Sequence, residues 1–100
     1  MGIINSLFKM PNNVRQFLNE GAVIIDVRTP QEYNAGHIKG SKNIPLDSLK
    51  NRWSEVEKMK KPVITVCQSG MRSGTAKSFL ESKGLRVANG GSWSGLNKLL

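Results

Sequence analysis

Two stretches of the chain are apolar at nearly every position. Residues 22–27 are AVIIDV and residues 62–67 are PVITVC, and both are rich in β-branched side chains. An apolar run without polar alternation is typical of a strand covered on both faces, as in a parallel sheet. We predict a strand in each stretch, a third, weaker strand at residues 85–88, and a short strand within residues 38–44.

Segments with helical spacing separate these strands. We predict a helix that Asn12 or Asn13 caps and that runs to Glu20, with Gly21 as its stop. The residues TPQE at 29–32 form a capping box with proline at the first helical position, so a short helix follows them and ends at Gly36.

Two longer helices complete the pattern. One follows the apolar stripe of residues 46–56, either unbroken or interrupted at a second capping-box pattern in residues 54–57. The other spans residues 73–83, with Ser73 as its cap and Gly84 as its stop. Strands that alternate with helices predict an α/β fold, with a mainly parallel central sheet flanked by helices on both faces, in one domain of residues 1–100.

The composition bears on the cellular compartment of the protein. The chain has 100 residues and a single cysteine, Cys67, so no internal disulfide forms, which is consistent with a reducing compartment. No apolar stretch approaches the roughly 20 residues that span a bilayer, and residues 1–9 lack the basic start and long apolar centre of a signal peptide. We therefore expect a cytoplasmic protein that does not interact with membranes.

The net charge of +8 is uneven. Residues 51–100 carry nine Lys or Arg against three Asp or Glu. The one tight basic run, residues 58–61, has no interleaved aromatic side chains, so we predict no nucleic-acid partner. The charge fits long-range attraction of small anions toward the half that contains Cys67, and equally fits an acidic partner protein.

The lone cysteine stands where a strand ends and a helix begins, in the segment CQSGMRS of residues 67–73. A strand–loop–helix turn points backbone N–H groups into the loop, and the helix adds its positive end. Both favour the thiolate, which is the reactive form of cysteine. Gly70 allows backbone conformations that a side chain forbids, and Arg72 offers a forked donor to an oxyanion. The loop predicts a nucleophile, although a cysteine is often just a small buried apolar residue.

The length of the loop bears on the reaction. Phosphate-cradling loops separate cysteine from arginine by five residues, whereas four residues, 68–71, separate Cys67 from Arg72 here. A tighter ring of amides leaves less room for a tetrahedral phosphate but still encloses one extra sulfur atom. This favours sulfur transfer over phosphoryl transfer.

Three ordered motifs then resemble the rhodanese family. Residues 26–33, DVRTPQEY, with residues 36–45, GHIKGSKNIP, are similar to its N-terminal signature. The strand into residues 67–73 is similar to the active-site loop of its single-domain members, and Gly90-Gly91 matches its C-terminal glycine pair. The resemblance covers about residues 12–95.

The resemblance implies a rhodanese-like fold and a thiosulfate sulfurtransferase that works through a cysteine persulfide without metal or organic cofactor. Cys67 would carry the sulfur, and the donor would be a small anion such as thiosulfate. The acceptor would be cyanide, a thiol or a partner protein. The amides of the loop would stabilise the sulfur, Arg72 would hold the donor, and three residues would brace the site. The loop residues are Gln68, Ser69, Gly70, Met71, Arg72 and Ser73, and the bracing residues are Asp26, Arg28 and Glu32.

Other interpretations stay open at this stage. The chain is alternatively a sulfur-carrier or protein-binding module without turnover, or a small phosphatase or arsenate reductase on the same scaffold. His37 is a candidate base for a Cys–His dyad, but nothing in the sequence brings it to Cys67, and a thiolate held by amides needs no base. Trp93 either lines the pocket or closes the core.

Overall fold

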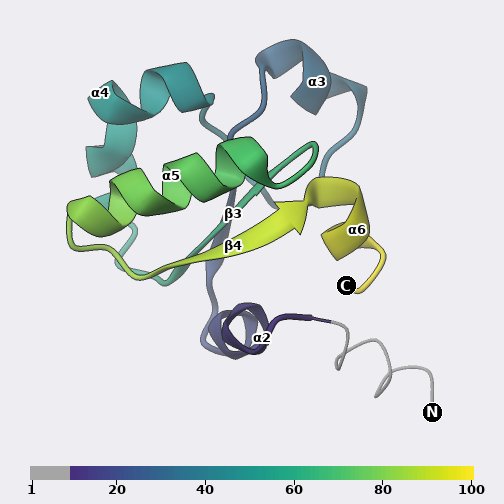
Figure 1. Ribbon diagram of the computed structural model, residues 1–100, viewed down its shortest axis with the longest axis horizontal. Helices are drawn as coiled ribbons and strands as arrows, with labels where there is room; N and C mark the ends of the chain where they lie inside the picture. The colour runs from purple at the N-terminus through teal and green to yellow at the C-terminus, as the bar shows by residue number, and fades with distance from the viewer. Residues whose placement is uncertain (1–9) are drawn as a thin grey trace.

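The protein is a four-stranded parallel sheet between two layers of helices (Figure 1). The computed structural model describes residues 10–100, so the expectation for residues 1–9 lies outside it. The strands lie in the order β2-β1-β3-β4. They are β1 (Val23–Asp26), β2 (Lys42–Asn43), β3 (Val63–Cys67) and β4 (Val87–Ser92). The predicted α/β fold with helices on both faces is confirmed.

The helices divide between the two faces. In Figure 1, α4 (Leu46–Glu57) and α5 (Met71–Ser82) lie together on one face, and α2 (Asn12–Asn19) lies on the other. The short helix α6 (Trp93–Asn97) follows β4, and α3 (Pro30–Ala35) follows the carboxyl end of β1. No helix in the described part of the chain is long and apolar enough to cross a bilayer.

Each face of the sheet has its own apolar core. Successive residues of a strand point to opposite faces. Ile64 and Val66 of β3 accordingly pack with Phe17 of α2, whereas Val63 and Cys67 pack in the cluster that contains Leu80 of α5. The register therefore directs the Cys67 side chain into the layer between the sheet and α5.

Two helix starts differ from the sequence-based expectation, and one open alternative is decided. The first described helix begins at Asn12, with Pro11 at the cap position, so the predicted asparagine cap is wrong. The expected alternative break at residues 54–57 does not occur, because Trp53 and Val56 on either side of Ser54 both pack on the core and hold α4 continuous. Helix α5 begins at Met71, so Ser73 lies within its first turn and is not the cap.

The last strand also differs. The apolar pattern predicted residues 85–88, but β4 runs through the glycine pair to Ser92. A Cβ atom on Gly90 would lie 2.8 Å from Cγ2 of Ile64 and 2.9 Å from Cγ1 of Val66, so only glycine lets the strand approach β3 this closely. The pairing shifts register between Thr65 and Val66 at this point. Trp93 follows this strand directly and begins α6.

Candidate active site

The chain turns from β3 into α5 through three residues, 68–70, directly after Cys67. The Cys67 side chain is buried, and the backbone N–H of Gly70 donates to its Sγ atom over 2.9 Å. Gly70 has φ of +102°, in the left-handed region that a residue with a side chain rarely adopts. The glycine thus lets the loop fold back so that its amide reaches the sulfur.

The environment of Cys67 favours the thiolate. Burial raises the pKa of the thiol, but hydrogen bonds outweigh burial and hold this pKa below its ordinary value. The hydrogen bonds come from the hydroxyl and backbone N–H of Ser73 and from the backbone N–H groups of Gly70 and Ser69. The loop therefore stabilises negative charge on the sulfur by directed N–H and O–H groups.

The Ser73 hydroxyl serves two acceptors. Its Oγ atom lies 3.4 Å from Sγ of Cys67 and 2.7 Å from Oδ1 of Asn89. One hydroxyl proton cannot occupy both hydrogen bonds. The shorter contact favours the hydrogen bond to Asn89, and Sγ of Cys67 is the second acceptor within reach of the same hydroxyl.

Asn89 is a site residue that the sequence analysis missed. Its Nδ2 donates to the carbonyl of Gly70 over 3.1 Å, and its Oδ1 accepts from the N–H of Gly91 over 2.9 Å as well as from Ser73. One amide side chain of β4 thus ties together the loop, the first turn of α5 and the bulged strand. A polar residue between the apolar pair of residues 87–88 and the glycine pair was the available signal.

Asp26 and Arg28, predicted to brace the site, form a buried ion pair at the neighbouring strand end. Parallel pairing sets Asp26 opposite Val66, so the ends of β1 and β3 meet at one edge of the sheet. The Arg28 side chain donates to both carboxylate oxygens of Asp26, with a shortest distance of 2.7 Å. It also donates to the carbonyls of Glu32 and Gly36. Arg28 and Asp26 are buried, so this pair fixes the path of α3 from inside the protein.

Glu32 connects α3 to the cysteine loop. Its two carboxylate oxygens accept from Nη1 and Nη2 of Arg72 over 2.7 and 2.9 Å. Glu32 also completes the capping box with Thr29, as predicted. The Arg72 guanidinium and then the Thr29 backbone N–H lower the pKa of Glu32 to about 2. The structure therefore brings two predicted site residues, Glu32 and Arg72, together beside the loop, and Arg72 holds a carboxylate of the protein itself.

The remaining candidates have other contacts. His37 is exposed, stacks on the ring of Tyr33 and donates from Nδ1 to the Tyr33 carbonyl over 2.8 Å. Trp93 packs on the core of the α2 face, and the guanidinium of Arg28 lies 4.7 Å from the centre of its ring. The His37 ring therefore packs against Tyr33, and the Trp93 ring packs against Arg28.

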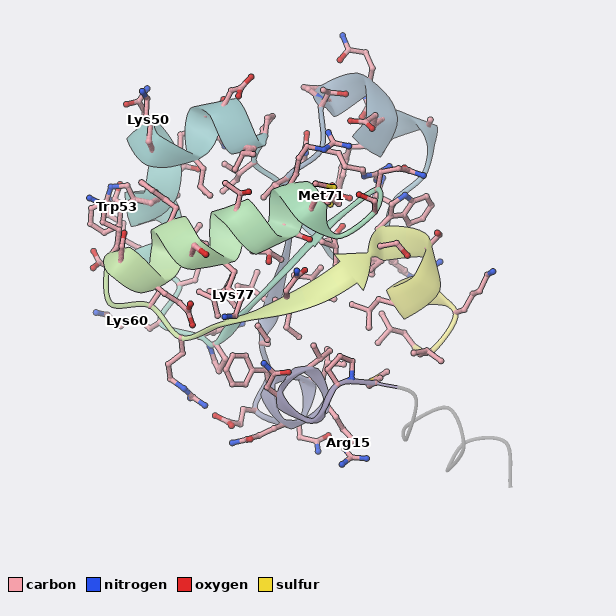
Figure 2. The ribbon with its side chains drawn as sticks, viewed as in Figure 1. Arg15, Lys50, Trp53, Lys60, Met71 and Lys77 are labelled. Atoms are coloured by element: carbon pink, nitrogen blue, oxygen red, sulfur yellow. The ribbon has the colours of Figure 1, made fainter. Side chains whose placement is uncertain are left out.

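The surface around the loop is uneven. Gln68 and Ser69 are exposed, and Met71, labelled at the start of α5 in Figure 2, is 79% exposed. A cavity of about 90 Å³ lies beside the loop. Its lining residues are Val27, Thr29, Pro45, Leu46, Asp47 and Arg72. Among residues 10–100, no three His, Cys, Asp or Glu side chains gather closely enough to hold a metal ion.

Comparison with known proteins agrees with this architecture. The family model of the rhodanese-like domain matches residues 10–96. Protein YqhL of Bacillus subtilis is 48% identical over 63% of this chain and 49% of its own length. The thiosulfate sulfurtransferase GlpE of Pseudomonas aeruginosa is 32% identical over 74% of this chain and 66% of its own length. The chain thus spans about half of the first relative and about two thirds of the second.

A solved structure agrees as well. The structure described as rhodanese with anions from Escherichia coli superposes with a TM-score of 0.69 and 36% identity. The superposition covers 74% of this chain and 89% of the other.

Proposed function

This chain belongs to the rhodanese-like family, and on that premise we propose that it is a sulfurtransferase that carries sulfur as a persulfide on Cys67. The observation that carries the proposal is the ring of donors around one buried sulfur. The N–H of Gly70 donates to Sγ, the hydroxyl of Ser73 lies 3.4 Å from it, and the pKa of the thiol is lowered despite burial. Such a ring stabilises a thiolate and, equally, the outer sulfur anion of a persulfide.

The reaction has two halves. The Cys67 thiolate attacks the outer sulfur of thiosulfate and forms a new S–S bond. The bond between that sulfur and the sulfite group breaks, and sulfite leaves with the electron pair. A nucleophile such as cyanide then attacks the outer sulfur of the persulfide, leaves as thiocyanate and restores the thiolate. In each half, one bond to the transferred sulfur forms while another breaks, and the leaving group takes the electron pair. No electrons are gained or lost overall, so the scheme needs no oxidant and uses no metal or organic cofactor.

The surrounding residues divide the remaining tasks. The backbone of residues 68–73 holds the sulfur, Arg72 binds the anionic end of the donor, and Asp26, Arg28 and Glu32 position α3 and Arg72. GlpE, a relative of this chain, is a thiosulfate sulfurtransferase, which supports thiosulfate as the donor to test first.

The proposed acceptor in the cell is a thiol or a partner protein, and the exposed Met71 beside the loop supports a protein. Methionine is a flexible apolar side chain that adapts to varied partner surfaces. We keep the cytoplasm as the expected location.

Intact mass of the reduced protein before and after exposure to thiosulfate tests the proposal. We expect addition of one sulfur atom, its removal by cyanide, and no addition to the Cys67→Ser variant. Turnover from thiosulfate to cyanide should be abolished in that variant, and appreciable residual turnover would exclude the persulfide mechanism. If no sulfur adds to the native protein, hydrolysis of a phosphate ester or reduction of arsenate would support the phosphoryl-type alternative.

A further inference from the structure

The anion-binding fork of the loop is already occupied by the protein. Arg72 uses both of its terminal nitrogens to hold the carboxylate of Glu32, at 2.7 and 2.9 Å. This is the two-pronged geometry with which arginine binds any planar or tetrahedral oxyanion. A donor that approaches Cys67 therefore meets an arginine whose charge is paired and whose two terminal nitrogens each already hold a carboxylate oxygen.

The rest of the edge offers little compensating charge. Arg28 is neutralised by Asp26 and is only 2% exposed. Asp47 lines the same cavity as Arg72 and adds a negative charge there. The basic run of residues 58–61 follows the end of α4, and Figure 2 shows its member Lys60 near the end of α5 that is opposite Met71. This basic run therefore lies away from the loop.

The Glu32–Arg72 pair is nevertheless open to exchange. Both side chains are 34% exposed, so solvent competes with each partner and the pair is weak compared with a buried one. A dianion such as thiosulfate offers the guanidinium the same kind of oxygen acceptor. The carboxylate and the donor are therefore alternative occupants of one fork.

We propose that Glu32 determines donor specificity by competing with the donor's anionic end for the Arg72 guanidinium. The proposal rests on the proposed sulfurtransferase function and deepens it. A donor binds to the fraction of molecules in which the pair is open, so its apparent affinity falls by that fraction. Donors that rely strongly on Arg72 are disfavoured relative to donors that rely on it weakly. The pair selects against highly charged oxyanions.

The Glu32→Gln variant tests the competition. An amide oxygen in place of Oε1 keeps the bonds from the Thr29 N–H and from Nη1 of Arg72. The amide nitrogen in place of Oε2 gives up the bond from Nη2, and the negative charge is lost, so the hold on Arg72 weakens. We expect the KM for thiosulfate to fall by about two- to fivefold, the range set by an exposed ion pair, with kcat changed by less than about twofold. A purely structural role of Glu32 would raise KM or lower kcat instead.

The chain supplies a matched control at its other end. Glu20 holds Arg86 through the same two-oxygen arrangement, at 2.9 and 3.3 Å, on an exposed surface. Glu20→Gln changes the net charge by the same amount, and its KM for thiosulfate should equal that of the native protein. An equal fall of KM in both variants would show a general charge effect and overturn the proposal.

Two further comparisons sharpen the assignment. With methanethiosulfonate, a donor of single charge that releases methanesulfinate, Glu32→Gln should lower KM less than with thiosulfate. In the Arg72→Ala background, adding Glu32→Gln should leave KM unchanged, because the fork is gone. A fall of KM in that background, or an unchanged KM in Glu32→Gln alone, contradicts competition at Arg72.

Binding without turnover separates this proposal from the proposed function. Thiosulfate is titrated into Cys67→Ser and into Cys67→Ser with Glu32→Gln, and amide chemical shifts of the loop are followed by NMR. A two- to fivefold lower Kd in the double variant supports the competition even if no persulfide forms in the native protein. An equal Kd in the two proteins overturns it even if sulfur transfer proceeds normally.

Discussion

Arg28 and Arg72 each donate hydrogen bonds to a carboxylate from two guanidinium nitrogens, but the first pair is buried and the second is partly exposed. Arg28 is 2% exposed, and besides Asp26 it holds two backbone carbonyls and lies over the ring of Trp93. Arg72 is 34% exposed and spans from α5 to Glu32 of α3. A buried pair resists opening because each lone charge would be stranded, whereas a half-exposed pair exchanges partners with solvent and solutes. The same pairing chemistry thus gives a fixed brace in one place and an exchangeable contact in the other.

The largest expected effect comes from breaking the buried pair. Asp26→Ala leaves the Arg28 guanidinium buried without its carboxylate and should lower the free energy of unfolding by about 3–5 kcal/mol. Urea denaturation followed by circular dichroism measures this loss. Glu32→Gln, which weakens the exposed pair and keeps its cap, should move the urea midpoint far less.

A rescue variant checks the cause of that loss. Asp26→Leu combined with Arg28→Met removes both charges and should recover much of the lost stability. Equal urea midpoints for Asp26→Ala and Glu32→Gln would erase the distinction between the two pairs.

Breaking the exposed contact should act on substrate and spare the fold. Arg72→Ala removes the charged donors for the anionic end of thiosulfate, so KM should rise by about tenfold in the thiosulfate–cyanide assay. The urea midpoint should stay close to that of the native protein. Large destabilisation with unchanged KM would place Arg72 with Arg28 as a brace.

The smallest expected effect isolates the sulfur from both arginines. Ser73→Ala removes a hydrogen bond to the thiolate, so the charged form loses stabilisation and the pKa of Cys67 rises toward that of an ordinary thiol. The fraction of thiolate then falls on the acid side, and loading by thiosulfate at pH 6.5 should slow by about threefold. The rate should approach that of the native protein as pH is raised above the thiol's pKa.

Thr75→Ala is the matched control for that change. Thr75 carries an exposed hydroxyl one half-turn further along α5, where it bonds to the carbonyl of Met71. The pH profile of loading should be unchanged in this variant. A profile that stays in place in Ser73→Ala would remove the Ser73 hydroxyl from the control of the thiol.

Local patterns allowed most of the fold to be predicted. The runs of residues 22–27 and 62–67 gave two strands because buried parallel strands need apolar residues on both faces. The capping box at Thr29 fixed the start of α3 because two reciprocal hydrogen bonds define it within four residues. Strand β4 was misplaced because its second half is a glycine pair, which carries no apolar signal and owes its place to the lack of a Cβ atom.

From the residues themselves, the site was predictable only as far as it lies in one segment, whereas Asp26, Arg28 and Glu32 were expected from the family resemblance. The geometry of the CQSGMRS loop could be predicted from its glycine and from the helix that follows it. Asn89 was missed because its partners, Gly70 and Ser73, are brought to it by the pairing of β3 with β4. The contact between the Arg72 guanidinium and the Glu32 carboxylate was not predicted, because 40 positions of sequence separate the two residues.

Asn89 also has a consequence for the energetics of the reaction cycle. Its amide group fixes Gly70, Ser73 and Gly91 by bonds that do not involve the sulfur itself. The cradle around Sγ is therefore preorganised, and in the proposed reaction the same backbone dipoles would face the thiolate before sulfur arrives and the persulfide afterwards. A fixed cradle would keep the reorganisation energy of both proposed half-reactions low.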